Sequence, residues 1–473
     1  MSAAEQLLSV RGLAVEYRGT HGERREIVAG FDLDLAAGET IGIVGESGSG
    51  KSLSARAIVR LLPPGVHADG SIRYRGRELS DAPDRVMAGL RGSSISMLLQ
   101  DPFTMLNPLL RTGRHIEECL AMVSGSHRRG DHRALRAEAA RRLSEVGISD
   151  PAVLDRYPFQ LSGGMRQRVA LAAALARDPD ILIADEPSTA LDVTTQAEIL
   201  RLLKSVQEDR GMGLILITHD LRVAFNVCDR VYVLYAGAVL ETAPAHALER
   251  EPLHPYSLGL LLSEPAIDRK HEALTAIEGS VPSPAEVAGM CRFAPRCRWA
   301  ADVCRSGEPP LLGVEQARRT ACIRLGEIRG EMQEMRTAAP AQALNSVVRI
   351  TTEAPLVRID QLRKVFRDRS GGGEVHALGG VTIEVGRNES VGIVGESGSG
   401  KTTLGRCLVG LERPTSGEVL VDGIDASELG KLPRDERVRV RQTVQMVFQD
   451  PYSSLDPMQS VGSALNEVLH FNG

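Results

Sequence analysis

The chain is poor in aromatic residues, carries little net charge and has no long apolar run. Only 3% of its 473 residues are aromatic, and the formal net charge is -5. Because this balance gives no general attraction for polyanions, we expect no nucleic-acid partner. No stretch approaches the ~18 apolar residues of a membrane-spanning helix, and the N-terminal MSAAEQLLSV lacks the basic and apolar regions of an export signal. We therefore expect a cytosolic protein whose contact with a membrane is at most peripheral.

The chain also lacks any C-x-x-C pair, although it contains seven cysteines. Without an export signal, these residues are better read as thiols or metal ligands than as disulfides. Four of them crowd into 291–322, with gaps of five, six and seventeen residues between neighbours. The missing C-x-x-C argues against a zinc ribbon, and four thiolates could hold a [4Fe–4S] cluster. Free or zinc-bound thiols are the alternative for these four residues: Cys291, Cys297, Cys304 and Cys322.

A long internal repeat organises the chain. ETIGIVGESGSGKSLSARAIVRLL at 39–62 recurs as ESVGIVGESGSGKTTLGRCLVGLE at 389–412, and a second pair at 96–109 and 445–458 keeps nearly the same offset. At about 150 residues per domain, the length suggests roughly three folded units. Two motifs preserved at one spacing indicate a duplicated domain.

Each copy carries the pattern G-x-x-x-x-G-K-[ST] between a β-branched run and a helical stretch. In the first copy we expect a strand over Thr40–Val44 and a helix from Lys51 to Leu62. Glycines let backbone N–H groups curl around phosphate oxygens, the lysine reaches the β- and γ-phosphates, and the hydroxyl ligates Mg²⁺. The predicted ATP-binding residues are Gly45, Ser47, Gly48, Gly50, Lys51 and Ser52, then Gly395, Ser397, Gly398, Gly400, Lys401 and Thr402.

Two adjacent carboxylates follow the apolar run of ILIADEP at 181–187. Such a run suits a buried parallel strand, and ligands gather at the carboxyl ends of these strands. We expect Asp185 to hold Mg²⁺ and Glu186 to polarise the attacking water. A solvated acidic strand end is the usual reading of an isolated Asp-Glu pair, but the surrounding motifs favour the catalytic one.

These motifs are LSGGMRQR (161–168), STALD (188–192) and LILITHD (214–220). With them the chain resembles the ATP-binding cassette family over 1–262 and over 355–473, and LSGGM is the family's most diagnostic element. The resemblance implies an α/β P-loop NTPase fold with a RecA-like core, an antiparallel β subdomain and a helical signature subdomain, present twice, with the second copy incomplete. It also implies ATP hydrolysis with Mg²⁺.

The resemblance assigns further residues to the nucleotide site. Ser162, Gly163 and Gly164 form a second phosphate cradle at a helix start, which in the family closes on ATP held by the opposite cassette. The resemblance places His219 at the γ-phosphate. Gln100 and Gln449 match the glutamine that senses Mg²⁺ and water. Tyr17 and Phe366 stand where the family stacks an aromatic ring on adenine, although core packing explains a strand aromatic equally well.

LHPYSLGLLLSEP at 253–265, with the cysteine-rich segment after it, resembles the ATPases of oligopeptide, dipeptide and nickel importers. Ser257 replaces the threonine of the HPYT-like element, and Phe159 stands where a histidine often precedes the signature. The resemblance implies an import ATPase on the cytoplasmic face of the inner membrane, bound to a separate permease and served by a substrate-binding protein. Peptides are the expected cargo, ATP binding closes the cassette dimer, and hydrolysis reopens it.

We expect four parts: a first cassette at 1–262, a cysteine-rich extension at 263–330, a linker at 331–354 and a partial second cassette at 355–473. A short terminal helix is the alternative for the linker. By the repeat offset, the second signature, carboxylate and histidine would fall near 512, 536 and 569, after the last residue of the chain. The first cassette would then pair with the second one in cis or with another copy of the chain.

Two other classes of function are the alternatives: a non-transport cassette protein, of repair or translation type, and a regulatory fragment. A repair-type ATPase would place hundreds of residues of coiled coil between phosphate loop and signature, whereas 162 − 51 = 111 separate them here. A translation factor would carry a charged helical linker between its cassettes. A regulatory fragment that binds ATP without hydrolysing it is distinguished only by measuring turnover.

Overall fold

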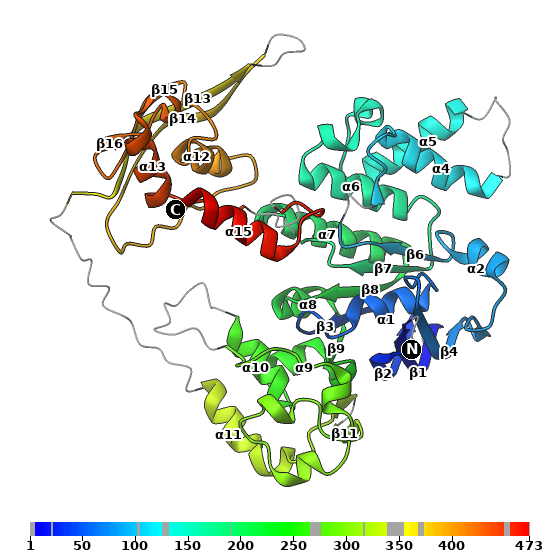
Figure 1. Ribbon diagram of the computed structural model, residues 1–473. Helices are drawn as coiled ribbons and strands as arrows, with labels where there is room; N and C mark the ends of the chain where they lie inside the picture. Colours follow the sequence, from blue (N-terminus) through cyan, green and yellow to red (C-terminus); the bar gives the residue numbers. More distant parts are fainter. Residues whose placement is uncertain are drawn as a thin grey trace. The chain divides into compact units, whose positions relative to one another are not determined.

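The computed structural model describes residues 5–19, 22–101, 105–124, 132–189, 191–264, 276–315, 317–337, 354–367, 373–448 and 455–472. The chain divides into two compact units, Met1–Asn345 and Ser346–Gly473, whose elements are labelled in Figure 1.

The first unit contains two sheets. An antiparallel sheet has the order β2-β1-β4-β5, and an eight-stranded sheet has the order β11-β12-β10-β9-β3-β8-β7-β6, in which β9, β3, β8, β7 and β6 are parallel. The strands of the first sheet are β1 (Gln6–Arg18), β2 (Arg24–Ala36), β4 (Val66–Tyr74) and β5 (Arg77–Glu78). Those of the second are β3 (Thr40–Val44), β6 (Ile95–Leu98), β7 (Ile181–Asp185), β8 (Gly213–Thr218), β9 (Arg230–Tyr235), β10 (Ala238–Pro244), β11 (Leu312–Glu315) and β12 (Arg318–Thr320).

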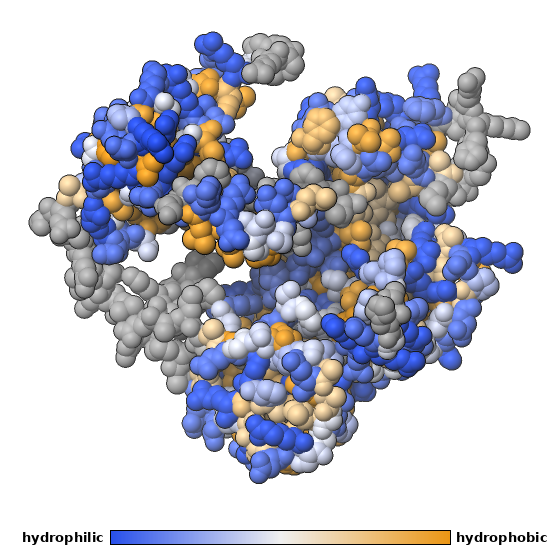
Figure 2. Space-filling model, in the orientation of Figure 1, coloured by the Kyte–Doolittle hydropathy of each residue, from blue (hydrophilic) through white to orange (hydrophobic). Residues whose placement is uncertain are grey.

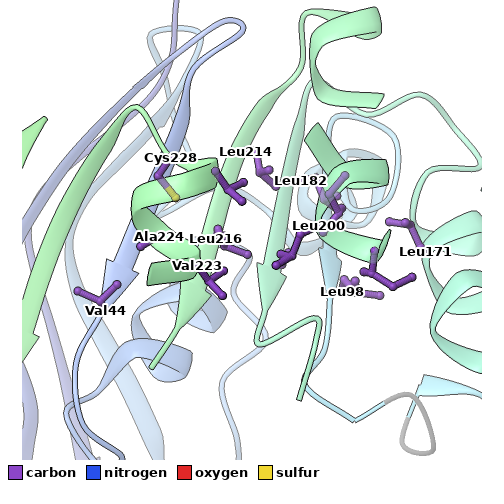
Figure 3. Packing of buried hydrophobic residues seen from close by; sticks show 14 of the residues in the cluster. Val44, Leu98, Leu171, Leu182, Leu200, Leu214, Leu216, Val223, Ala224 and Cys228 are labelled. Atoms are coloured by element: carbon purple, nitrogen blue, oxygen red, sulfur yellow. The ribbon is translucent and has the colours of Figure 1, made fainter. Parts of the chain in front are cut away.

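The central strands are buried along their whole length. Every residue of β3, β7 and β8 is buried, as expected for apolar runs in a parallel sheet covered by helices. Figure 3 shows strand leucines of this sheet facing side chains of α7 (Val193–Arg210) and α8 (Leu221–Val227). The strands predicted at Thr40–Val44 and at the apolar run before Asp185 are both present.

Helix α1 (Lys51–Ile58) is shorter than predicted. The expected helix to Leu62 is wrong over its last four residues, because Arg60 adopts a left-handed conformation with φ 52°. The Leu61 N–H bonds back to the Arg56 carbonyl at 2.8 Å, which closes the helix end. Pro63 and Pro64 follow, and a proline disfavours the helical conformation of the residue that precedes it.

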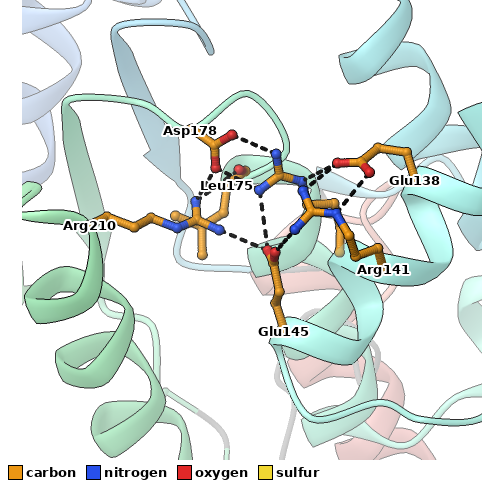
Figure 4. A network of polar contacts seen from close by, with 7 residues as sticks. Glu138, Arg141, Glu145, Leu175, Asp178 and Arg210 are labelled. Carbon is orange, nitrogen blue, oxygen red and sulfur yellow. Dashed lines mark hydrogen bonds and ion pairs between the residues drawn. The ribbon is translucent and has the colours of Figure 1, made fainter.

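A helical layer formed by α4 (Thr112–Ser124), α5 (His132–Glu145) and α6 (Gly163–Ala174) is tied to the sheet by a polar network (Figure 4). Arg142 of α5 donates two 2.6 Å hydrogen bonds to Asp178, in the turn before β7. Arg210, at the end of α7, contacts the same carboxylate at 2.9 Å and Glu145 at 2.8 Å. Arg210 also donates to the carbonyl oxygen of Leu175, the C-cap of α6, at 3.2 Å. The network therefore joins α5 and the end of α6 to the end of α7 and to the turn before β7.

The unit ends with the extension, which packs on the edge of the large sheet through β12 beside β10. Two helices, α9 (Ala245–Arg250) and α10 (Pro255–Ser263), lead from β10 to the extension, which includes α11 (Leu325–Thr337) and 3₁₀ turns at Pro284–Val287, Ala294–Arg296 and Asp302–Arg305. The first seven residues of the predicted linker at 331–354 belong to α11. Residues 331–337 are therefore helical, as in the alternative interpretation of this segment as a short terminal helix. Ile328 and Met332 lie on one face of this helix and pack with Leu258 of α10, which explains its order. The remaining elements of this unit are α2 (Asp84–Leu90) and 3₁₀ turns at Pro151–Asp155 and Pro158–Gln160.

The second unit repeats the opening part of the first. Its sheet has the order β14-β13-β15-β16, and its elements are β13 (Val357–Arg367), β14 (Glu374–Val385), β15 (Ser416–Val421), β16 (Ile424–Asp425), α12 (Lys401–Leu408), α13 (Arg434–Thr443), α15 (Val461–Asn472) and a 3₁₀ turn at Leu429–Lys431. The segment 391–394, which repeats the sequence of β3, is not a strand, and Val394 is 96% exposed. The described part of this unit offers no strands like β8 and β9 to flank it. Figure 2 shows apolar residues at the surface of this unit.

Candidate active site

The loop between β3 and α1 has the backbone of a phosphate cradle. Gly48 and Gly50 have φ of 83° and 99°, in the region that favours glycine. A Cβ on Gly45 would lie 2.1 Å from the Leu234 carbonyl oxygen, so this position requires glycine as well. Lys51 is 6% exposed and donates from Nζ to the carbonyl oxygens of Gly45 at 2.7 Å and Glu46 at 2.9 Å. Burial lowers the pKa of Lys51, against the pull of nearby carboxylates.

The second unit builds the same loop. Gly398 and Gly400 have φ of 84° and 95°, and Lys401 Nζ donates to the carbonyl oxygens of Gly395 at 2.6 Å and Glu396 at 2.7 Å. The two loops therefore have the same backbone turn and the same lysine contacts. Ser47 lies in the first loop, and Ser397 and Thr402 occupy the matching places around the second.

A hydroxyl and a carboxylate meet beside the first loop. Ser52, in the first turn of α1, donates to Asp185 Oδ1 at 2.9 Å, at the end of β7. Asp185 is 1% exposed, and burial raises the pKa of its carboxyl group. Hydroxyl and carboxylate oxygens are ligands that Mg²⁺ accepts beside a nucleotide phosphate, so this pair fits the predicted metal site.

Glu186 gathers three neighbours on one oxygen. Its Oε2 accepts hydrogen bonds from Gln100 Nε2 at 3.0 Å and from Thr189 Oγ1 at 2.8 Å, and it lies 3.3 Å from His219 Nδ1. The contact with His219 lowers the pKa of Glu186, and Glu186 in turn raises the pKa of His219. With φ 47°, Glu186 adopts a conformation that is rare outside glycine and common at functional sites. Thr189 was not predicted, although it lies in the STALD motif.

The signature turn lies at the start of α6. The Ser162 side chain accepts from Met165 N at 3.3 Å and so caps the helix that Gly163 and Gly164 begin. This leaves the first N–H groups of α6 at a positive helix end, as a phosphate cradle needs.

The two predicted adenine-stacking rings are surface residues. Tyr17 at the end of β1 is 38% exposed, and Phe366 in β13 is 37% exposed with Lys364 Nζ 4.7 Å from the ring centroid. Partial exposure argues against core packing as the explanation for either ring. Gln449, predicted for the second site, lies outside the described residues.

The four clustered cysteines are free thiols that line one small cavity, together with His254, Phe293 and Trp299. Burial raises the pKa of Cys297 to about 11 and that of Cys322 to about 12. Within the described ranges, no three Cys, His, Asp or Glu side chains are grouped closely enough to hold a single metal ion. Nor does any helix in the described part of the chain have the length and apolarity to cross a bilayer.

Comparison with known proteins assigns the family. The profile of the family described as "ABC transporter" matches residues 28–189 and 378–468, and that of "Oligopeptide/dipeptide transporter, C-terminal region" matches 240–304. The chain is 41% identical over 473 residues to "Oligopeptide transport ATP-binding protein OppD" of Mycobacterium tuberculosis, covering 99% of this chain and 76% of that protein. It is 37% identical over 481 residues to "Glutathione import ATP-binding protein GsiA" of Salmonella typhimurium, covering 99% and 68%.

Among solved structures, "Dimeric structure of a post-hydrolysis state of the ATP-binding cassette MJ0796 bound to ADP and Pi" aligns with 29% identity and a TM-score of 0.46, over 50% of this chain and 99% of that one. The two relatives are named for oligopeptide transport and for glutathione import, and neither name points to translation or repair. The two family profiles and the 41% identity establish that the chain belongs to the ABC transporter family, as an ATP-hydrolysing subunit of its oligopeptide/dipeptide branch.

Proposed function

We propose that the chain energises the import of peptides, with glutathione as a second candidate cargo, through a separate membrane permease fed by a substrate-binding protein. The observation that carries the proposal is the first-cassette site, where the lysine loop, the Ser52–Asp185 pair and the Glu186–His219 pair adjoin. The relatives' names support peptide or glutathione as cargo. Work with a permease would place the chain at the cytoplasmic face of the inner membrane.

In this proposal each residue has one task. The loop amides and Lys51 bind the phosphates, and Ser52 and Asp185 hold Mg²⁺, which neutralises phosphate charge when bound. Glu186 orients the attacking water, and its carboxylate is held by His219 and Gln100. His219 contacts the γ-phosphate, and Gln100 senses Mg²⁺ and water. Ser162 and the two signature glycines bind the triphosphate of the opposite cassette. Tyr17 and Phe366 stack on adenine.

The cargo can be tested in proteoliposomes that contain this chain, its co-purified permease and the binding protein. We expect ATP turnover to rise several-fold on adding oligopeptides, and labelled peptide to accumulate inside only with ATP on the nucleotide-binding side. Stimulation by glutathione alone would reassign the cargo. Turnover without any transported solute would overturn the proposal of import.

We also propose that the four thiols bind a [4Fe–4S] cluster. Support comes from the small cavity that all four thiols line. The residue types fit the cluster, because its four irons take one thiolate each and this cavity offers four free thiols. The cluster would cross-link the extension, where Cys291 N already donates to the Cys304 carbonyl at 2.8 Å.

Anaerobic purification tests this proposal. We expect brown protein with about four irons and four acid-labile sulfides per chain, since that is the composition of the cluster. Cys297→Ser should lower both contents, whereas Cys228→Ser, at a buried cysteine outside the cavity, should keep them. Colourless, iron-free protein would exclude the cluster, and zinc in its place would favour the structural alternative.

A further inference from the structure

The phosphate loop of the first cassette is held at Glu46 by one residue from the last helix of the cassette and one from the extension that follows it. The Glu46 N–H donates to Tyr256 Oη at 2.9 Å, and the Glu46 carboxylate pairs with Arg296 at 2.8 Å and 3.2 Å. Tyr256 lies in α10, and Arg296 ends a 3₁₀ turn of the extension. One loop residue is therefore fixed by both its main chain and its side chain.

Further hydrogen bonds hold the guanidinium group of Arg296 beside Glu46. It donates to the carbonyl oxygens of Ile277 at 3.0 Å, Glu278 at 2.7 Å and Gly279 at 3.2 Å, and to Tyr235 Oη at 3.3 Å. Its side chain is 6% exposed, and that of Glu46 is 28% exposed. A pair with so little solvent around it is screened less than a surface pair, and its loss leaves a charge in a poorly hydrated place.

A cluster of three aromatic rings supports the same contact. The ring centroid of Tyr235 lies 4.5 Å from that of Tyr256 and 5.4 Å from that of Phe293, and the last two lie 5.3 Å apart. All three side chains are buried. Tyr235 ends β9, whose neighbouring Leu234 carbonyl lies directly beneath Gly45. The aromatic cluster thus joins the strand under the loop to α10 and the extension.

We propose that Arg296 and Tyr256 are positioning residues that hold the phosphate loop in its ATP-binding shape through Glu46, so that the cysteine-bearing extension is part of the ATP site. They act through Glu46, whose carbonyl oxygen accepts a hydrogen bond from Lys51 Nζ. Release of Glu46 would let this carbonyl and its N–H turn, and the lysine and loop amides would lose their common geometry. The inference rests on the proposed role of the loop in binding ATP.

Single substitutions in the full-length chain test the proposal. Arg296→Gln removes the ion pair, and Tyr256→Phe keeps the ring packing but removes the hydroxyl that accepts from Glu46. We expect each to raise the Kd for a fluorescent ATP analogue and the KM for ATP by roughly three- to tenfold, as expected for losing one hydrogen bond of this kind, with a smaller change in kcat. Arg298→Gln, two residues along the same segment, is the matched control and should leave both values unchanged.

A double-mutant cycle shows whether the arginine acts through the loop. If it does, Arg296→Gln combined with Glu46→Gln weakens ATP binding no more than either change alone. Full additivity, or wild-type affinity in both Arg296→Gln and Tyr256→Phe, overturns the inference. An affinity loss that appears only in Arg296→Gln, together with a lower melting temperature and altered thiol titration, would show a structural role and also overturn it.

Lys51→Ala separates this inference from the proposed function. If Lys51→Ala loses ATP binding while Arg296→Gln and Tyr256→Phe do not, only the inference fails. If Lys51→Ala binds ATP like the wild type, the role of the loop itself is wrong.

Discussion

At the scale of single residues, the neighbours of the Glu186 carboxylate determine both its charge and its orientation. The contact with His219 lowers its pKa, so it is ionised at neutral pH and can accept a hydrogen bond from water. Gln100 and Thr189 hold the same oxygen and so fix its direction. A carboxylate held in this way serves to orient and polarise water, and contributes little to binding the nucleotide.

Glu186→Gln should therefore separate binding from turnover. We expect the Kd for ATP to stay within about twofold and kcat to fall by about 10²- to 10⁴-fold, the usual contribution of a positioned general base. Equilibrium binding and steady-state phosphate release measure the two quantities. Glu208→Gln, at an exposed glutamate of α7, should change neither. An equal loss of binding and turnover would contradict the role given to Glu186.

Residue contacts within one motif or between familiar motifs could be predicted from the sequence. Lys51, Ser52 and Asp185 were assigned from spacing and flanking strands, and the structure brings them together. The contacts of Glu46 could not be predicted, because Tyr256 and Arg296 lie 210 and 250 residues away and no local pattern links them. Such pairings depend on how the extension packs, which periodicity does not reveal.

At the scale of elements, the first turn of α6 packs against the first turn of α7. A Cβ on Gly164 would lie 2.6 Å from Thr195 Cγ2, whereas one on Gly163 would lie 3.6 Å from Leu191 Cδ2, an ordinary contact. Thr195 cannot move easily, because its N–H and hydroxyl both bond to Asp192. The two signature glycines therefore differ in purpose: Gly164 is required for packing, and Gly163 keeps the outer face of the turn open.

Substituting alanine for Gly164 should mainly lower stability, whereas substituting it for Gly163 should mainly lower turnover. Gly164→Ala should destabilise the chain by roughly 1–3 kcal/mol through overpacking, seen as a lower midpoint of thermal unfolding. Gly163→Ala should keep that midpoint, since alanine favours helix and meets no clash, but should lower kcat because its methyl group obstructs approach to the opposite nucleotide. Equal melting and equal turnover in both variants would refute this division.

From the sequence, the presence of a strand or helix with a clear hydrophobic pattern could be predicted more reliably than the residues at which it begins and ends. The strands β3 and β7 were identified from apolar runs, but α1 ends at Ile58 because a left-handed residue and two prolines follow. The segment 331–337 continues the helix because Ile328 and Met332 pack on Leu258 of α10. In the second unit, 391–394 has the sequence of a central strand without the form of one, because a buried parallel strand needs neighbours on both edges.

At the scale of the whole molecule, the motifs are unequal in number. The 473 residues contain two phosphate loops, at 45–52 and 395–402, but the sequence LSGG occurs once, at 161–164. If a complete site combines a phosphate loop of one cassette with a signature of another, then in a polypeptide of these 473 residues the loop at Lys51 can meet an LSGG signature of another cassette only in a second copy. A closed pair of first cassettes would hold two such sites, related by a twofold axis.

Mixing experiments test this arrangement. Lys51→Ala and Ser162→Ala chains should each be inactive alone, and specific activity of the wild type should rise with protein concentration. In an equal mixture, half of the pairs are mixed and one of their two sites is intact, so about a quarter of wild-type activity should return if pairing is random and symmetric. Lys51→Ala mixed with Glu186→Gln is the matched control. Lys51 and Glu186 both belong to the cassette that holds the nucleotide, so neither of the two composite sites of a mixed pair is intact. Recovery in the control, or none in the first mixture with concentration-independent activity, would show that the site is completed within one chain.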